Sequence, residues 1–173
     1  GADRHMRDFR RCVRDLIHLR RSLPALSGEG IRVPQVHEAD RVLVMHRWVE
    51  GEGRDVVVVA SLNETTLQAY PIDMPAPSRC HEVFNSDYYD HFPNEHVIGN
   101  GGGVDANGPP GRLYPHTARA RMPANGALVW RSRAESIDTS LTRIFDPRLG
   151  WSRMILAMSS RWSTANRVGS VAT

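Results

Sequence analysis

The residues of this chain that could do chemistry gather around a long loop, residues 84–104. Ser86, Asp87 and His91 have the residue types of a nucleophile, an orienting acid and a general base. The serine lacks the Gly-x-Ser-x-Gly elbow that presents a nucleophile on a strained turn, and all three residues fall within one short segment. We therefore predict that they form no nucleophilic site.

Two pairs of carboxylates could in principle act as an acid and a base. Glu50 and Glu52 lie in a glycine-rich turn, where no burial is available to raise the pKa of either group. Asp87 and Asp90 flank two tyrosines in the loop, and aspartates in loops commonly bond to nearby backbone groups. The favoured interpretations are a solvated hairpin turn for the first pair, and capping or turn bonds for the second.

Histidines and glutamates near the loop could bind a metal ion. The residues concerned are His81, His91 and His96, with Glu82 or Glu95. Their spacings match neither a helical interval nor a zinc motif. We predict surface histidines without a ligand, no metal and no cofactor.

A glycine run in the loop is similar in composition to loops that hold phosphate groups. Gly99 and the glycines at 101–103 allow backbone angles that are closed to other residues. A phosphate-binding loop also needs a strand before it and a helix N-terminus after it, whereas Pro109 and Pro110 follow here. The run therefore predicts turns.

Aromatic side chains could bind sugars, whose ring faces stack on tyrosine and tryptophan. Trp48 and Trp130 fall within strand patterns, and the core is their favoured place. Tyr88 and Tyr89 are adjacent in the loop and could contact a glucan chain. They are the candidate substrate-binding residues, and no catalytic residue is predicted.

A helix should precede the elements that carry these residues. Apolar residues recur at intervals of three, four and seven between residues 3 and 23, which indicates an amphipathic helix. They are Met6, Phe9, Val13, Leu16, Ile17 and Leu23. Pro24 should end the helix, because the residue before a proline is pushed out of helical geometry. Such an apolar stripe needs a surface to pack against, either in this chain or in a part absent from it.

Beyond Gly30 the apolar period changes from that of a helix to that of a strand. The run at 56–59 is apolar on both faces, which is typical of a central strand. Strands about ten residues apart with hairpin-length connections favour antiparallel sheets over parallel βαβ units. The predicted fold class is mainly β, an antiparallel two-sheet sandwich preceded by one N-terminal α-helix. Strands are expected at 31–33, 42–48, 56–59, 67–72, 80–84, 116–122 and 127–131.

The chain of 173 residues is long enough for one core and too short for two ordinary domains with a cleft between them. We predict three parts. Residues 1–27 form the amphipathic helix and residues 28–132 form the all-β domain. Residues 133–173 form a tail rich in serine, threonine, arginine and asparagine, which should be poorly ordered or separate from the domain.

Charge and cysteine usage exclude several classes of partner. All 22 basic residues are arginine, and the net charge of +3 lies in the segment after Ser132. A nucleic-acid partner needs clustered positive charge on a folded face, so none is expected. No apolar run approaches the roughly 20 residues of a membrane-spanning helix, so no membrane partner is expected. Without a secretion signal, Cys12 and Cys80 favour reduced, buried thiols in the cytoplasm.

Several segments, in order, resemble the end of α-amylase superfamily (glycoside hydrolase family 13-like) enzymes, most closely the 1,4-α-glucan (glycogen) branching enzyme type. Residues 9–26 contain the Asp-Leu-Ile-x-Leu-Arg and Pro-Ala-Leu pieces of the last helix of that family's (β/α)8 barrel. Residues 42–48 and 56–63 resemble the opening strands of its all-β C-terminal domain, which end at an asparagine, here Asn63.

Later segments resemble the closing part of the same domain, and the ordered set covers about residues 6–131. They are Glu82-Val-Phe-Asn-Ser-Asp87, Gly99-Asn-Gly-Gly102 and Pro123-Ala-Asn-Gly-Ala-Leu-Val-Trp130. The resemblance implies a Greek-key sandwich of the amylase C-terminal type.

The resemblance also implies what the chain lacks. Enzymes of this kind break and remake α-glucosidic bonds with two carboxyl groups about 5 Å apart, at the C-terminal ends of barrel strands. Those strands would precede Gly1. The resemblance therefore implies a non-catalytic C-terminal domain of an α-glucan glycosyltransferase, whose partner is the catalytic barrel that it covers and stabilises.

Three further expectations stay open at this point. The domain could be a carbohydrate-binding module that contacts α-1,4-glucan such as glycogen or starch. The parent enzyme could be a related amylase or a trehalose-forming enzyme, because the barrel residues that distinguish them are not in this chain. The isolated chain could also self-associate through the apolar stripe of its N-terminal helix.

Overall fold

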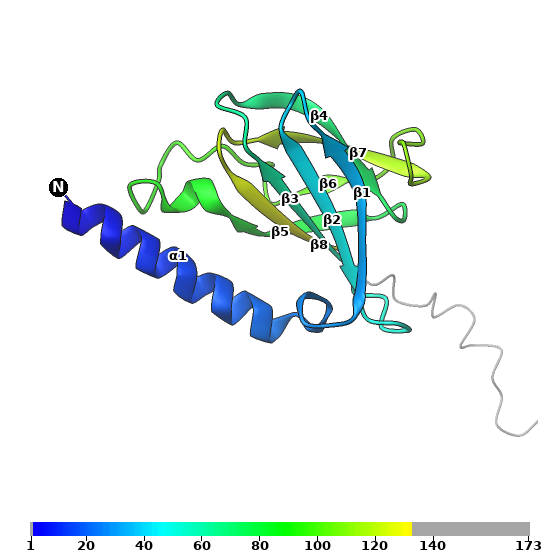
Figure 1. The fold of residues 1–173 in the computed structure, drawn as a ribbon, viewed down its shortest axis with the longest axis horizontal. Coiled ribbons are helices and arrows are strands. Elements are labelled where there is room, and N and C mark those ends of the chain that lie inside the picture. The colour runs from blue at the N-terminus through cyan, green and yellow to red at the C-terminus, as the bar shows by residue number, and fades with distance from the viewer. Residues whose placement is uncertain (1, 133–173) are drawn as a thin grey trace, which may run out of the picture. The chain divides into compact units, whose positions relative to one another are not determined.

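A computed structural model describes residues 2–132 as one α-helix followed by eight strands in two antiparallel sheets (Figure 1). The predicted fold class is therefore confirmed. The tail predicted at 133–173 lies outside the described residues. The helix is α1 (Ala2–Ser22), and the strands are β1 (Gly30–His37), β2 (Val42–Trp48), β3 (Val56–Ser61), β4 (Leu67–Met74), β5 (Arg79–Asn85), β6 (Gly103–Asp105), β7 (His116–Met122) and β8 (Ala127–Ser132).

Helix α1 ends where the sequence predicts. The backbone N–H of Leu23 still donates to the carbonyl of Leu19 at 3.0 Å, but Leu23 itself is extended, as expected of a residue before proline. Pro24 then begins a short 3₁₀ helix, η1 (Pro24–Leu26), in which Ala25 is buried. This turn carries the chain from the helix to the first strand. Within residues 2–132, no helix is long and apolar enough to cross a membrane.

The larger sheet has six strands in the order β1-β2-β3-β8-β5-β6. The valine-rich strand β3 lies between β2 and β8, which confirms the central place predicted for it. Strand β1 is longer than the predicted 31–33, because it continues past Pro34 through an irregularity in its pairing with β2. There Gln35 lies beside β4, accepts from the N–H of Asp73 at 3.2 Å and donates to the carbonyl of Pro71 at 3.1 Å.

Strands β4 and β7 form the second sheet, and the main core lies between the two sheets. From Ala118 onward strand β7 alternates, with Ala118, Ala120 and Met122 buried and Arg119 and Arg121 exposed, as expected of a half-buried strand. The largest side chains sealed in this core are Trp130, Ile72, Met74, Met122 and Leu128.

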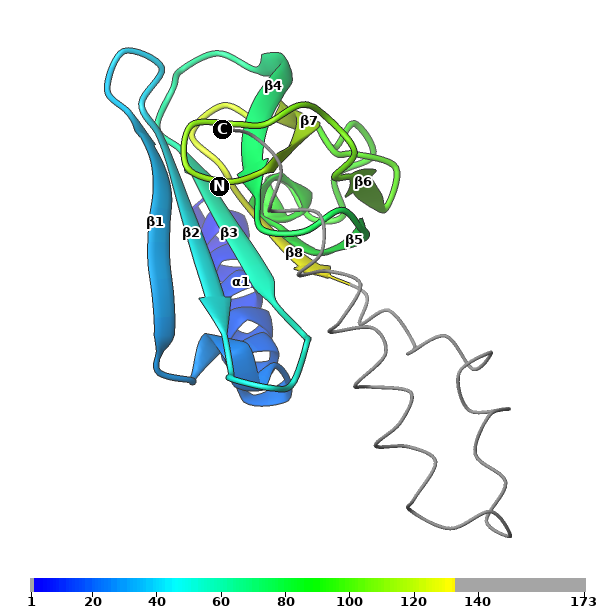
Figure 2. The same ribbon diagram turned by 90° about the vertical axis from the view of Figure 1, so that its right-hand side faces the viewer.

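Helix α1 lies against the other face of the six-stranded sheet (Figures 1 and 2). A second, smaller apolar cluster lies on this face. Its buried members are Leu23, Ala25, Val56, Phe84 and Val129. The helix therefore packs against the sheet face that points away from β4 and β7. One face of the helix is covered by this chain, which answers part of the question left open by the sequence.

The loop at 84–104 is shorter and more structured than the sequence predicts. It begins with a 3₁₀ turn, η2 (Ser86–Tyr89), and ends in β6, which was not predicted. Gly101 and Gly102 have φ of +59° and +87°, the left-handed region that favours glycine. The glycine run thus forms a turn. Cys80 is buried as expected, whereas Cys12 is only half-buried; both thiols are free.

Candidate functional site

Helix α1 meets the β domain through a face that is only partly apolar. Cys12 and Leu19 pack against the cluster of Val56, Phe84 and Val129. The rest of this face carries Asp8, Asp15 and the arginines beside them. The contact therefore combines a small apolar patch with a set of polar bonds.

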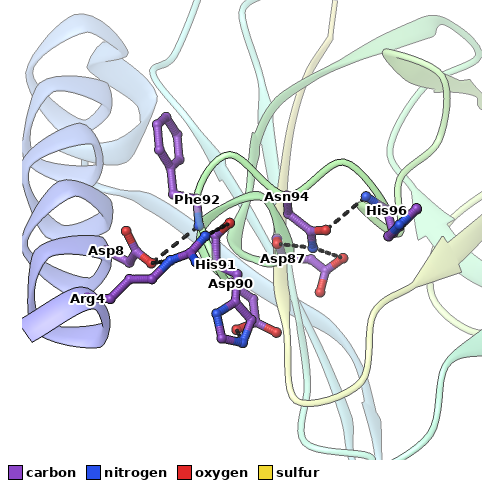
Figure 3. A network of polar contacts seen from close by, with 8 residues as sticks. All are labelled: Arg4, Asp8, Asp87, Asp90, His91, Phe92, Asn94 and His96. Atoms are coloured by element: carbon purple, nitrogen blue, oxygen red, sulfur yellow. Dashed lines mark hydrogen bonds and ion pairs between the residues drawn. The ribbon is translucent and has the colours of Figure 1, made fainter. Parts of the chain in front are cut away.

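Asp8 is the centre of the polar contact, and it is only 6% exposed. Its Oδ2 accepts from the backbone N–H of Phe92 at 3.3 Å, and its Oδ1 accepts from Arg11 at 3.4 Å. Arg4 donates to the carbonyl of His91 at 3.0 Å (Figure 3). A carboxylate so far from water needs such partners, because an unpaired buried charge is strongly destabilising. We call the contacts of Arg4, Asp8 and Arg11 with the loop the helix clamp.

Tyr89 adds a bond to the helix one turn further along. Its hydroxyl donates to Oδ2 of Asp15 at 2.9 Å. Partial burial, followed by this bond to a carboxylate, raises the pKa of Tyr89 well above its usual range. The same bond, helped by Arg14, lowers the pKa of Asp15. Both shifts favour the neutral phenol bonded to the charged carboxylate.

Aromatic rings fill the space between the loop and the helix. The ring of Tyr89 stacks on Phe84 and on Phe92, at centroid distances of 5.7 and 5.9 Å. The guanidinium of Arg11 lies over the Phe92 ring, 4.1 Å from its centroid. The ring of Tyr89 is therefore packed between Phe84 and Phe92, and its hydroxyl is bonded to Asp15.

Tyr88 lies differently, although it is the next residue. Its ring meets Tyr89 and Phe92 edge-on, and 42% of the residue is exposed. A shallow hollow beside it is lined by Glu82, Asn85 and Val97, among others. Of the two predicted substrate-binding residues, Tyr88 is thus the more exposed.

Asp87 holds the loop in shape, as the sequence interpretation expected. Its Oδ2 accepts from the N–H of Ile98 at 2.6 Å. Asn94 donates to the carbonyl of Asp87 at 2.9 Å (Figure 3). Asn85 caps η2 by accepting from the N–H of Asp87 at 3.0 Å. These bonds fix the position of Tyr88 on the surface.

The other side of α1 is uncovered in the described part of the chain. It exposes an apolar row that we call the outer stripe, in which Met6 and Phe9 are each 66% exposed and Ile17 is 48% exposed. The outer stripe consists of Met6, Phe9, Val13, Leu16 and Ile17. The sequence predicted this stripe but not that the helix would turn a different face to the β domain.

The remaining sequence candidates have structural roles. Ser86 Oγ accepts from the N–H of Ala127 at 2.8 Å, so it joins η2 to β8. Glu50 accepts from the indole of Trp48 at 3.3 Å in an exposed turn. Trp130 is buried, as predicted, whereas Trp48 is only partly so. Among residues 2–132, no three histidine, cysteine, aspartate or glutamate side chains lie together as a metal site would need.

The sequence interpretation also missed a buried polar group around His46. His46 bonds to the hydroxyl of Tyr114 at 2.7 Å and to Oδ2 of Asp55 at 2.9 Å, and its ring stacks on Trp48. The signal available was a histidine at a core-facing position of an alternating strand. The group holds the loop before β7 against β2, and both ring nitrogens of His46 have a partner.

Comparisons with known proteins agree with the resemblance seen in the sequence. The model of the family described as alpha amylase, C-terminal all-beta domain, matches residues 34–133. The 1,4-alpha-glucan branching enzyme GlgB of Paraburkholderia xenovorans (strain LB400) is 28% identical over 125 residues. That match covers 69% of this chain and 17% of the branching enzyme, so the chain corresponds to a small part of that protein.

A solved structure gives a weaker likeness. The crystal structure of an alpha-amylase from H. orenii superposes with a TM-score of 0.43 at 16% sequence identity. The superposition covers 69% of this chain and 19% of that one.

Proposed function

Since the chain belongs to the family of α-amylase C-terminal all-β domains, we propose that it is the C-terminal domain of a 1,4-α-glucan branching enzyme-like transferase. In this proposal the domain is non-catalytic and cytoplasmic. It holds α1 in place and, through α1, covers and stabilises the catalytic (β/α)8 barrel of the intact enzyme. The similarity to a branching enzyme supports the choice of parent, and a related amylase or trehalose-forming enzyme is the alternative.

One observation carries the covering role. Helix α1 binds its own β domain through a face that is only partly apolar and leaves its most apolar face, the outer stripe, in solvent. A helix that packed only against this chain should do the reverse. Full burial of a side chain such as Phe9 or Ile17 stabilises by about 1.5–3 kcal/mol, so a second surface on this stripe would gain a large contribution.

The covering role is tested by replacing apolar residues of the outer stripe. Phe9→Ser with Ile17→Ser should lower binding of a hydrophobic dye to the isolated chain, and any self-association with it. In the full-length enzyme the same pair should lower the unfolding temperature. Leu62→Ser is the matched control, because Leu62 is exposed outside the stripe. A strictly monomeric isolated chain with no dye binding and a disordered α1 would contradict the proposal.

The proposal also predicts that the isolated chain has no catalytic activity. In this proposal the carboxylates that such enzymes use belong to barrel strands of the intact enzyme and not to residues 1–173. Incubation of the chain with amylose should leave iodine staining unchanged. A change in staining would show a catalytic site within this chain and would overturn the assignment.

A carbohydrate-binding module is the second candidate, and the exposure of Tyr88 favours it. Tyrosine rings beside polar side chains are typical sugar contacts, and Tyr88 lies next to a hollow that contains Glu82 and Asn85. Calorimetry with maltoheptaose separates the two functions. A measurable heat of binding supports the carbohydrate-binding module, and no heat of binding supports the covering role.

If maltoheptaose binds, variants of the two tyrosines show whether Tyr88 or Tyr89 contacts it. Tyr88→Ala should abolish it and Tyr88→Phe should largely preserve it, because the ring remains. Tyr89→Phe should leave it unchanged, since the Tyr89 hydroxyl is bonded to Asp15. If binding survives Tyr88→Ala, the contact surface lies elsewhere.

A further inference from the structure

The charges of α1 are divided between its faces. Asp8 and Asp15 accept hydrogen bonds from Phe92 and Tyr89, so both point towards the β domain. A row of exposed arginines runs along one edge of the outer stripe, at helical intervals of three, four and seven residues. We call it the arginine edge, and it consists of Arg7, Arg10, Arg14 and Arg21.

The arginine edge has little to bind within the described residues. Arg14 pairs with its neighbour Asp15 at 3.0 Å, whereas no ion pair or side-chain hydrogen bond within residues 2–132 involves Arg7, Arg10 or Arg21. Arg7 and Arg10 line a hollow together with Met6, Phe9 and Val13 of the stripe, and Asp3 lies at its start. By contrast, Arg4 and Arg11 on the clamp side both have partners.

A surface that covers the outer stripe must also meet this edge. Arginine guanidinium groups at the rim of an apolar contact lose part of their hydration, and they then need hydrogen-bond acceptors on the partner surface. Arginine suits carboxylates in particular, because its planar fork can bond both oxygens. We propose that the surface which covers α1 carries carboxylates opposite the arginine edge. The contact is then an apolar groove with a row of carboxylates along one side, which we call the acidic lip.

This inference rests on the proposed function, because it describes the barrel surface that function requires. An anionic membrane could also attract a helix with an apolar stripe and an arginine edge. We favour a protein surface, because α1 is held on a folded domain by the helix clamp, and because the related branching enzyme extends far beyond the matched segment. The membrane is treated as an outcome of the test.

The test reverses two arginine charges in the full-length enzyme and in this chain alone. Arg7→Glu with Arg10→Glu should speed amide hydrogen exchange of α1 in the full-length enzyme by about ten-fold. The reason is that two attractive ion pairs with the covering surface are replaced by repulsion between like charges. In the 173-residue chain the same pair should not speed exchange, because these side chains have no partner among residues 2–132 and the new glutamates lie four positions before Arg11 and Arg14. The matched control is Arg112→Glu with Arg121→Glu, which makes the same charge change at exposed positions outside α1.

Each outcome has a defined meaning. In one outcome, Phe9→Ser speeds amide exchange of α1 in the full-length enzyme, but neither the arginine double variant nor 0.5 M NaCl, roughly three times physiological ionic strength, does so. The acidic lip is then wrong and the covering role stands. If neither change has an effect, the covering role is contradicted as well. If the full-length enzyme binds phosphatidylglycerol vesicles only with its arginines intact, and exchange without vesicles is unchanged, the edge serves a lipid surface and the inference is overturned.

Discussion

The sandwich core and the junction beneath α1 are stabilised in different ways. The core is sealed by large apolar side chains from both sheets, such as Trp130, Ile72 and Met122. The junction has five buried apolar residues and depends on the helix clamp and on the bond between Tyr89 and Asp15. The β domain should therefore be stable by itself, and α1 should be the element that opens first.

The largest effect should come from the core. Trp130→Ala should lower the free energy of unfolding by about 3–5 kcal/mol, because it leaves a cavity where the largest buried side chain was. Urea unfolding followed by circular dichroism measures the loss, and Trp130→Phe should cost less. Hydrogen exchange should speed up in α1 and in β3 alike. If only α1 responded, the core would not be the main source of stability.

Loss of the clamp carboxylate should affect α1 alone. Asp8→Ala leaves the N–H of Phe92 and the Arg11 side chain without their acceptor, which typically costs about 1–3 kcal/mol. Asp8→Asn is the matched control, because its amide oxygen can still accept from Phe92. Amide exchange should rise in α1 for the alanine variant and change little in β3 and β8. Equal loss in both regions would show one cooperative unit.

Removal of one hydroxyl should have a smaller effect in the same place. Tyr89→Phe keeps the stacking on Phe84 and Phe92 but loses the bond to Asp15, worth about 0.5–1.5 kcal/mol. The α1 amides near Asp15 should exchange faster, by less than in the Asp8→Ala variant. An unchanged rate would mean that packing alone holds this end of the junction.

The smallest effect should be a dependence on pH. The folded pKa of Asp15 is lowered, so its contribution is present above the ordinary aspartate pKa of about 3.9 and is lost as the pH falls through the folded value. The folded pKa of Tyr89 is raised, so its contribution is present below about pH 10 and is lost as the pH rises through the folded value.

Nuclear magnetic resonance can follow both limits by residue. Signals of α1 near Asp15 should shift or broaden as the pH falls below the ordinary aspartate range, while signals of β3 stay fixed. The Asp15→Asn variant should show no such acid response. A response that persists in this variant would assign it to another carboxyl group.

Periodicity was enough to predict most of the fold. The helix and seven strands follow from intervals of 3.6 and 2, and Pro24 and the glycine turns mark their limits. Strand β6 was missed because it has three residues and begins within a glycine run. The continuation of β1 was missed because Pro34 looks like a stop and the pairing simply skips it.

The candidate site was harder to predict, because its contacts join distant parts of the chain. Tyr88 and Tyr89 are equivalent in the sequence, but Tyr89 points inward to reach an aspartate that lies 74 positions earlier. Nothing in the local pattern indicates that Asp8 is buried or that α1 uses its polar side to dock. Only the folded arrangement shows which helix face is left in solvent.

The side chain of Gln35 does for β4 what a neighbouring strand would do. Its amide oxygen and nitrogen meet one N–H and one carbonyl on the strand edge that β7 leaves free. An open strand edge is a template on which another chain can add itself and begin to aggregate. A single glutamine, aimed there by the irregularity in β1, thus occupies the place where a foreign polypeptide would otherwise attach.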